Sequence, residues 1–207
     1  AHRPTRAILT SMEAPLGTAI GNSLEIDEAV DALSGRGSRR LMEVVMVIGT
    51  QMLLLGEKVK TEEEGKALLQ SLIDSRKGLK KFKEFVKAQG GDTSWVGKKP
   101  LTKAEQVYTA ICTDEGYIHH IDGRALGDIA MTMGAGRAKK EDAIDPMVGI
   151  RLFKELGDEV HCGDLLFKLY AKKDAPIEEL AQRVASHIEV RPDRLAPPVV
   201  VSEIITP

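Results

Sequence analysis

The residues best suited by type and spacing to do chemistry are a glycine-containing loop and a glutamate that follows it. The loop runs from Pro15 to Gly21, and Glu28 lies between one and two turns into a helix expected from about Ser23. From there its carboxylate can fold back toward backbone carbonyls of the loop, and such oxygens are the ligands that hard cations prefer. An ordinary loop, helix cap and surface glutamate give the same pattern, so the residues alone leave both interpretations open.

A strand and a helix are expected to position this loop. Residues 7–10 form an apolar run that predicts a buried strand leading into the loop. Asn22 followed three residues later by Glu25 resembles a capping box and predicts the helix start near Ser23. Gly35 stands where a left-handed glycine commonly ends a helix. The apolar face of this helix consists of Leu24, Ala29, Val30 and Leu33.

Three more helices are expected in the first half of the chain. Apolar residues cover most of the circumference of residues 41–55, which predicts a helix buried on nearly all sides. Thr61 and Glu64 form a second capping box at the start of the next helix. A helix over 78–89 is expected to end at Gly90. Its inward side chains are expected to be Leu79, Phe82, Phe85 and Val86.

The character of the sequence changes at residues 91–102, where Asp, Ser, Gly, Lys and Pro replace periodic apolar residues. This change indicates a domain boundary. Beyond it, the alternation at 107–112 and the run at 117–121 predict two strands joined as a hairpin. The other expected elements are a helix at 125–133, strands at 148–152 and 165–170, a helix from Pro176 through Ile188, and a last strand at 199–205. The second half is therefore expected to be mostly β with two helices.

Composition and charge exclude several classes of function. The 29 basic and 31 acidic residues nearly balance, so nothing indicates a nucleic-acid or membrane-surface partner. Cys112 and Cys162 lack disulfide-framework or zinc spacing, and a reducing cytoplasm is the expected location. The longest apolar run, 41–55, is interrupted by polar residues and is shorter than a bilayer span of about 20 residues. Because the chain opens on Ala1 rather than Met, we expect it to be part of a longer protein.

No catalytic set of side chains stands out from the residues alone. His119 and His120 are neighbours on an expected strand, so they should point to opposite faces and not act as joint ligands. The glycine-rich residues 134–137 follow a helix rather than precede one, which favours a helix end over a phosphate cradle. Residues 157–164 resemble the hairpin of biotinyl and lipoyl carrier domains without the carrier lysine. They favour a barrel-sandwich fold without carrier function.

Several short blocks stand in a specific order along the chain. They are SMEAPLG (11–17), GNSLE (21–25), KAQGGD (87–92), GAGR (134–137), KED (140–142), ID (144–145) and VGI (148–150). In order and spacing these blocks closely resemble the thymidine and pyrimidine-nucleoside phosphorylases over essentially the whole chain. Several blocks at the right separations are far more specific than any one of them.

The resemblance implies that the chain is the C-terminal half of such an enzyme. Residues 1–95 would be the C-terminal part of its catalytic, glycosyltransferase-type α/β domain, and residues 96–207 a C-terminal α/β-hammerhead domain that is barrel-sandwich-like. The implied fold class is α/β followed by α+β. The implied enzyme is a cytoplasmic, homodimeric pentosyltransferase that cleaves thymidine- or uridine-type nucleosides, with phosphate as co-substrate, to free base and (deoxy)ribose 1-phosphate. Neither nucleic acid nor membrane is implied as a partner.

The resemblance also implies where functional residues lie. The family's phosphate- and base-binding motifs fall upstream, so no catalytic or substrate-binding residue is expected in this chain, and the chain alone should be inactive. Ser71–Lys77 mimics the family's serine-lysine motif but precedes the 87–92 block, where the family has an ordinary helix junction. The family binds a monovalent cation, potassium, and the matching ligands here are the backbone carbonyls of Leu16 and Ala19 and the carboxylate of Glu28. The upstream phosphate loop would supply the remaining oxygens.

A hypothesis from a different class is a self-standing, non-catalytic binding or dimerisation module built on the barrel-sandwich domain. The two hypotheses differ in what they expect of the gene. An open reading frame that continues upstream through a glycine-rich phosphate motif favours the enzyme. A start codon near Ala1 favours the module.

Overall fold

The computed structural model describes residues 4–137, 139–196 and 198–206, and the chain divides into two compact units. Unit 1 comprises Ala1–Ser11, Ala29–Lys99 and Val199–Pro207, and unit 2 comprises Met12–Glu28 and Pro100–Pro198. One limit, between Lys99 and Pro100, lies close to the expected division at residue 95. The assignment of 1–95 and 96–207 as two domains of an enzyme stays a prediction.

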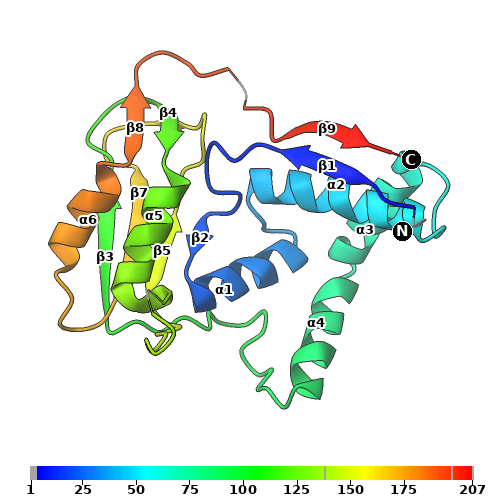
Figure 1. The fold of residues 1–207 in the computed structure, drawn as a ribbon, viewed down its shortest axis with the longest axis horizontal. Helices are drawn as coiled ribbons and strands as arrows, with labels where there is room; N and C mark the ends of the chain where they lie inside the picture. Colours follow the sequence, from blue (N-terminus) through cyan, green and yellow to red (C-terminus); the bar gives the residue numbers. More distant parts are fainter. Residues whose placement is uncertain (1–3, 138, 197, 207) are drawn as a thin grey trace. The chain divides into compact units, whose positions relative to one another are not determined.

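Unit 1 combines helices with a two-stranded antiparallel sheet. Its sheet pairs β1 (Ala7–Thr10) with β9 (Val201–Ile205), so the two ends of the described chain lie side by side (Figure 1). Its helices are α2 (Arg39–Leu55), α3 (Glu62–Asp74) and α4 (Lys77–Ala88), together with the last turns of α1 (Asn22–Leu33). Helix α3 packs against both α2 and α4.

The helix ends in unit 1 follow local sequence rules. The Thr61 hydroxyl accepts a hydrogen bond from the Glu64 N–H at 3.2 Å, as the capping box predicts, and the Glu64 carboxylate accepts the Lys60 N–H at 2.8 Å. Gly35 and Gly90 both adopt a φ of +80° just beyond a helix. The predicted helix ends at these two glycines are therefore confirmed.

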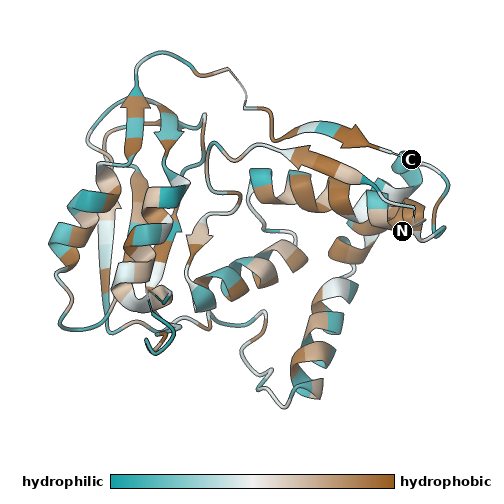
Figure 2. Cartoon of the chain, viewed as in Figure 1, coloured by the Kyte–Doolittle hydropathy of each residue, from teal (hydrophilic) through white to brown (hydrophobic). Residues whose placement is uncertain are grey.

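Two predictions of burial in unit 1 are wrong. Three of the four residues of β1 are exposed, although the apolar run predicted a buried strand. Helix α2 is largely apolar (Figure 2), yet Val45, Ile48 and Met52 are 44%, 39% and 67% exposed, and Phe85 of α4 is 60% exposed. The physical reason is that one two-stranded sheet and a few helices offer too little surface within unit 1 to cover these residues.

Unit 2 contains two antiparallel sheets. The four-stranded sheet has the order β2-β5-β7-β3, and the three-stranded sheet has the order β6-β4-β8. The strands of the first sheet are β2 (Ala19–Ile20), β5 (Gly149–Leu152), β7 (Leu165–Ala171) and β3 (Gln106–Ile111). Those of the second are β6 (Glu159–Val160), β4 (Gly116–Ile121) and β8 (Ile188–Arg191).

Two helices complete the core of unit 2. Helix α5 (Gly123–Ala130), extended by a π-helical turn at Met131–Ala135, contacts β2 and β5, and α6 (Ile177–Ala185) contacts β3 and β7. The Asp122 side chain caps α5 by accepting the Ala125 N–H at 3.0 Å. Side chains from both sheets and both helices are fully buried together, among them Ile118, Leu126, Ile150, Phe167, Leu169 and Val184.

The structure corrects two expected elements of unit 2. The alternation at 107–112 and the run at 117–121 predict a hairpin of β3 and β4, but β3 pairs with β7, and β4 pairs with β6 and β8. The helix expected through Ile188 ends at Ala185, and Ile188 begins β8 instead. Residues 184 and 188 are one helical repeat apart, so apolar spacing alone could not reveal that the chain changes from helix to strand.

The architecture is thus mixed α/β with several antiparallel sheets. Within the described ranges the strands form no closed barrel. The finer description as an α/β-hammerhead or barrel-sandwich domain stays a prediction. No helix of the described residues is long and apolar enough to cross a membrane.

Candidate functional site

The loop before α1 is fixed to strand β5 through its backbone. The Leu152 N–H donates to the Thr18 carbonyl at 2.7 Å, and β2 continues this pairing with Ile20 opposite Ile150. Gly21 follows with a φ of +139°, and a Cβ there would lie 2.6 Å from the Val148 carbonyl oxygen. Only glycine fits this close backbone approach.

Helix α1 begins within one residue of its predicted start, but its capping differs from the prediction. The Glu25 carboxylate accepts a hydrogen bond from the Gly21 N–H at 3.2 Å, so the expected reach back toward the helix start is present. The Asn22 side chain instead donates to the Ala135 carbonyl at 2.8 Å. The Asn22 side chain therefore links α1 to Ala135, the last residue of the π-helical turn.

Glu28 folds back onto the loop, as its spacing allowed. It is only 6% exposed. Its Oε1 accepts the Thr18 N–H and the Thr18 hydroxyl, both at 2.7 Å, and its Oε2 accepts the Ala19 N–H at 3.3 Å. The interpretation of Glu28 as an ordinary surface glutamate is therefore wrong.

Gly17 provides the space that the Glu28 carboxylate occupies. A Cβ built on Gly17 would lie 2.1 Å from Glu28 Oε2 and 2.8 Å from its Cδ. No side chain can share that volume, so the loop forms a cradle closed on one side by bare backbone. Glycine is needed at position 17 because the Glu28 carboxylate occupies the space of a side chain, and not because the backbone adopts a left-handed φ.

Strand geometry indicates where the Ala19 carbonyl points. Thr18 and Ile20 face β5, and in an antiparallel pair the residue between two such positions directs both its N–H and its C=O away from the partner strand. The Ala19 N–H reaches Glu28, so its carbonyl opens toward the same edge of β2. Leu16, directly before Gly17, is 40% exposed. That the carbonyls of Leu16 and Ala19 share a cation with Glu28 stays a prediction.

The charge of Glu28 is buried without an opposite charge beside it. In the described part of the chain no basic side chain forms an ion pair with its carboxylate, whose partners are the donors of Thr18 and Ala19. A buried carboxylate is costly unless it is hydrogen-bonded and paired. A monovalent cation would supply the missing charge, so the donor set fits such an ion. The same ranges contain no cluster of three His, Cys, Asp or Glu side chains placed to hold a metal.

Asp27, the residue before Glu28, forms a second anchor that the sequence did not reveal. Its carboxylate accepts the Leu101 N–H at 2.7 Å, the Thr102 N–H at 3.1 Å and the Thr102 hydroxyl at 2.8 Å. Burial raises the pKa of the nearby Tyr170, and the negative charge of Asp27 raises it further, against the opposing effect of Arg151. No local signal could have found this anchor, because its partners are more than 70 residues away in the chain.

Comparison with known proteins shows what the chain is similar to. Residues 117–191 match the family model described as the pyrimidine nucleoside phosphorylase C-terminal domain. A pyrimidine-nucleoside phosphorylase of Bacillus subtilis (strain 168) is 40% identical over 199 residues, which are 96% of this chain and 46% of that protein. Over nearly its whole length the chain is similar to pyrimidine-nucleoside phosphorylases.

A second member of the pyrimidine-nucleoside phosphorylase family gives the same picture. The protein of that name from Staphylococcus aureus (strain bovine RF122 / ET3-1) is 38% identical over 205 residues, 99% of this chain and 47% of that protein. The chain spans about half the length of the curated relatives it matches.

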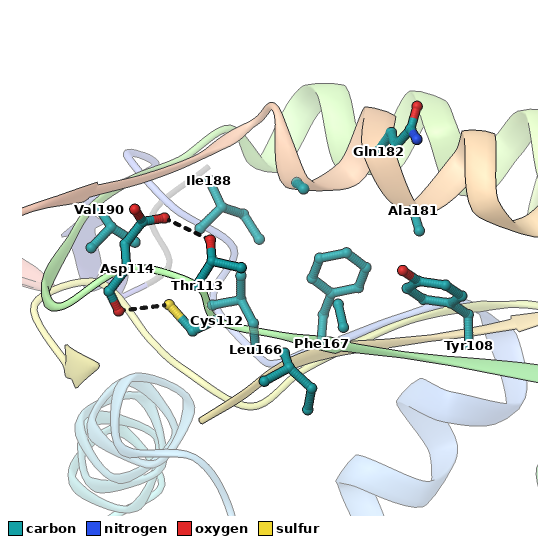
Figure 3. Close-up of a pocket in the computed structure, with 13 residues that line it drawn as sticks. Tyr108, Cys112, Thr113, Asp114, Leu166, Phe167, Ala181, Gln182, Ile188 and Val190 are labelled. Carbon is teal, nitrogen blue, oxygen red and sulfur yellow. Dashed lines mark hydrogen bonds between the residues drawn. The ribbon is translucent and has the colours of Figure 1, made fainter. Parts of the chain in front are cut away.

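A cavity within unit 2 lies between α6 and strands β3, β7 and β8 (Figure 3). Its volume is about 370 Å³, and aromatic, aliphatic and a few polar side chains line it, including Tyr108, Phe167 and Gln182. The buried Cys112 thiol donates to the Asp114 carbonyl at 3.3 Å, and the Thr113 hydroxyl donates to the Asp114 carboxylate at 3.1 Å. Asp114 is the charged residue of this lining.

The two adjacent histidines behave differently from their prediction. A β-bulge at His119 shifts the pairing of β4 with β8, and both His119 and His120 line a cavity of about 410 Å³. His119 Nε2 lies 2.5 Å from the Asp193 carbonyl oxygen. Strict alternation along a strand placed them on opposite faces, and the bulge removes that alternation.

The glycine-rich residues 134–137 do follow a helix, with Gly134 at a φ of +108°, so their interpretation as a helix end is confirmed.

Proposed function

We propose that this chain is the C-terminal part of a pyrimidine-nucleoside phosphorylase. The proposed reaction transfers the pentose of a thymidine- or uridine-type nucleoside to phosphate. A phosphate oxygen bonds to the anomeric carbon, the carbon–nitrogen bond to the base breaks, and the base leaves with the electron pair and takes up a proton. The observation that carries the proposal is identity of about two residues in five to pyrimidine-nucleoside phosphorylases over nearly the whole chain.

In this proposal no residue of the chain touches the reacting atoms. The groups that hold phosphate and base belong to a segment upstream, and the enzyme is a cytoplasmic homodimer. The part of the site that lies here is the cation site, where the Glu28 carboxylate and the Leu16 and Ala19 carbonyls hold potassium. A bound ion would supply a positive charge beside the buried Glu28 carboxylate.

The proposed cation site is supported by three features of the loop. Glu28 is buried against it, Gly17 leaves room for Oε2, and the donors of Thr18 and Ala19 hold the carboxylate in one orientation. Together they keep a negative charge fixed at the end of a backbone turn before any ion binds. Such preorganisation lowers the cost of binding.

The proposed domain description is an α/β-hammerhead that follows the end of the catalytic domain. Gly157 and Gly163, with φ of +86° and +94°, lie in turns on either side of β6, which pairs with β4. Lys154 links the residues before and after β6 by donating to the Asp164 carboxylate at 2.6 Å. That carboxylate has a pKa below its usual value, chiefly because of this bond.

The test is an assay of thymidine and uridine cleavage with phosphate, using protein purified from a host that lacks its own nucleoside phosphorylases. The complete gene product that contains this chain should release free base only when phosphate is present. The 207-residue chain alone should release none, because electrostatic stabilisation by the phosphate-binding groups carries much of such catalysis. Turnover by the chain alone would contradict the proposed division of the site, and an inactive complete gene product would contradict the proposed reaction.

A further inference from the structure

Thr18 connects two elements of unit 2. Its backbone carbonyl accepts the Leu152 N–H of β5 at 2.7 Å. Its N–H and its hydroxyl both donate to Glu28 Oε1, each at 2.7 Å. Thr18 therefore fixes the Glu28 carboxylate relative to the four-stranded sheet.

The two oxygens of the Glu28 carboxylate differ in how fully they are bonded. Oε1 accepts two short hydrogen bonds, which use its two lone-pair directions. Oε2 accepts one bond of 3.3 Å from the Ala19 N–H and lies over the bare backbone of Gly17. Oε2 therefore keeps a lone pair that can face an ion.

We propose that Thr18 is a positioning residue whose hydroxyl holds Oε1 and so presents Oε2 to the cation. The inference rests on the proposed function, because it requires Glu28 to be a cation ligand. The terminal torsion of a glutamate side chain is broad. Without the hydroxyl, only the Thr18 N–H at 2.7 Å and the longer bond from the Ala19 N–H at 3.3 Å would restrain the carboxylate plane. The hydroxyl supplies the second donor that fixes Oε1 and, through it, Oε2.

The main test compares three variants of the complete gene product in their potassium response. Thr18→Val removes the hydroxyl and keeps the branched shape, Thr18→Ser keeps the hydroxyl, and Thr102→Val is the matched control. The control removes the same kind of bond, from a threonine hydroxyl to the carboxylate of Asp27 at 2.8 Å. Thr18→Val should raise the potassium concentration for half-maximal activity about tenfold, the effect of one lost bond to a charged group. Thr18→Ser and Thr102→Val should stay close to the parent protein.

A second readout needs no cation and no activity. In the 207-residue chain, the Ala19 amide hydrogen should exchange with solvent faster in Thr18→Val, because the carboxylate that accepts it is less firmly held. Thr18→Ser should restore the slow exchange. This measurement keeps the test decisive even where a variant lowers the yield of complete enzyme.

The outcomes separate this inference from the function on which it rests. A weaker potassium response and faster Ala19 exchange in Thr18→Val alone support it. A Thr18→Val response equal to that of Thr102→Val would overturn the positioning role while leaving the cation site in place. A parent protein that shows no potassium response at all would overturn the proposed cation site and this inference with it, whatever the exchange rates show.

Discussion

Asp27 and Glu28 are consecutive residues of α1 with the same kinds of hydrogen bond. Each carboxylate accepts two backbone N–H groups and one threonine hydroxyl. Glu28 bonds to residues ten or fewer positions before it, whereas Asp27 bonds to residues more than 70 positions after it. Glu28 is 6% exposed, and Asp27 is half-buried.

The difference in burial separates a structural anchor from a candidate ligand. Water can complete the stabilisation of the Asp27 charge, so this carboxylate needs no ion to hold the start of the 100–198 segment. Glu28 has little access to water and sits in a cradle that a single Cβ would fill. The hydrogen bonds of the two carboxylates are of the same kind. What distinguishes Glu28 from Asp27 is its lower exposure to solvent and the position of Gly17 against its carboxylate.

We expect the largest effect, a loss of stability, from Gly17→Ala. The Asp27 carboxylate offers no equivalent substitution. The new Cβ would lie 2.1 Å from Glu28 Oε2, so the carboxylate must leave the cradle and give up its bonds to Thr18 and Ala19. We expect the 207-residue chain to lose about 2–4 kcal/mol of unfolding free energy in urea titrations.

The matched control for Gly17→Ala is Gly127→Ala. A Cβ on Gly127, inside α5, would meet nothing within 4 Å. Alanine is the better helix former, so this variant should be more stable by about 0.5–1 kcal/mol. Equal behaviour of the two variants would contradict the cradle.

The second effect separates the two carboxylates by charge. In the complete gene product, Glu28→Gln should raise the potassium concentration for half-maximal activity by about tenfold or more, because a neutral amide replaces the formal charge that faces the ion. Asp27→Asn makes the same chemical change one residue away and should leave this concentration unchanged. Equal shifts in the two variants would show a general effect of charge on α1 rather than a ligand.

The third effect is on stability at Asp27. In Asp27→Asn one oxygen still accepts a hydrogen bond, but the amide nitrogen faces an N–H donor of Leu101 or Thr102. We expect a loss of about 1–2 kcal/mol in the urea-derived unfolding free energy of the 207-residue chain. A variant as stable as the parent would show that water already replaces this anchor.

The smallest effect is expected for Thr102→Val. Only the hydroxyl bond to Asp27 is lost, while both backbone N–H groups keep their acceptor. The expected cost is about 1 kcal/mol, measured as a shift of the urea midpoint without a change of slope. A loss larger than that of Asp27→Asn would mean that the valine disturbs packing rather than the anchor.

Local features of the sequence were sufficient for much of the site. The fold-back of Glu28, the helix stop at Gly35 and the capping box at Thr61 each depend on residues ten or fewer positions apart, and the structure contains all three. Their physics is short-range: a turn, a cap and a side chain that reaches one or two turns of helix. Such features can be read from one sequence without knowledge of the fold.

Features that depend on distant partners were missed. The pairing of β3 with β7 places Gln106 opposite Ala171, and Asp27 bonds to Thr102, which lies 75 positions later in the chain. No local sequence pattern encodes either of these contacts. Apolar spacing likewise identified the apolar residues of α2 but not what covers them, so Met52 was expected inside and is 67% exposed. Periodicity shows which residues can be buried, whereas tertiary structure decides which are.

The most direct test of the central claim, that Glu28 is a cation ligand and Asp27 is not, is a diffraction experiment. Crystals of the complete gene product would be grown with thallium(I) in place of potassium, and anomalous differences would locate the ion. We predict one peak in contact with Glu28 Oε2 and the carbonyl oxygens of Leu16 and Ala19. A well-ordered Glu28 with no peak beside it, or a peak at Asp27 instead, would contradict the role of Glu28 as a cation ligand.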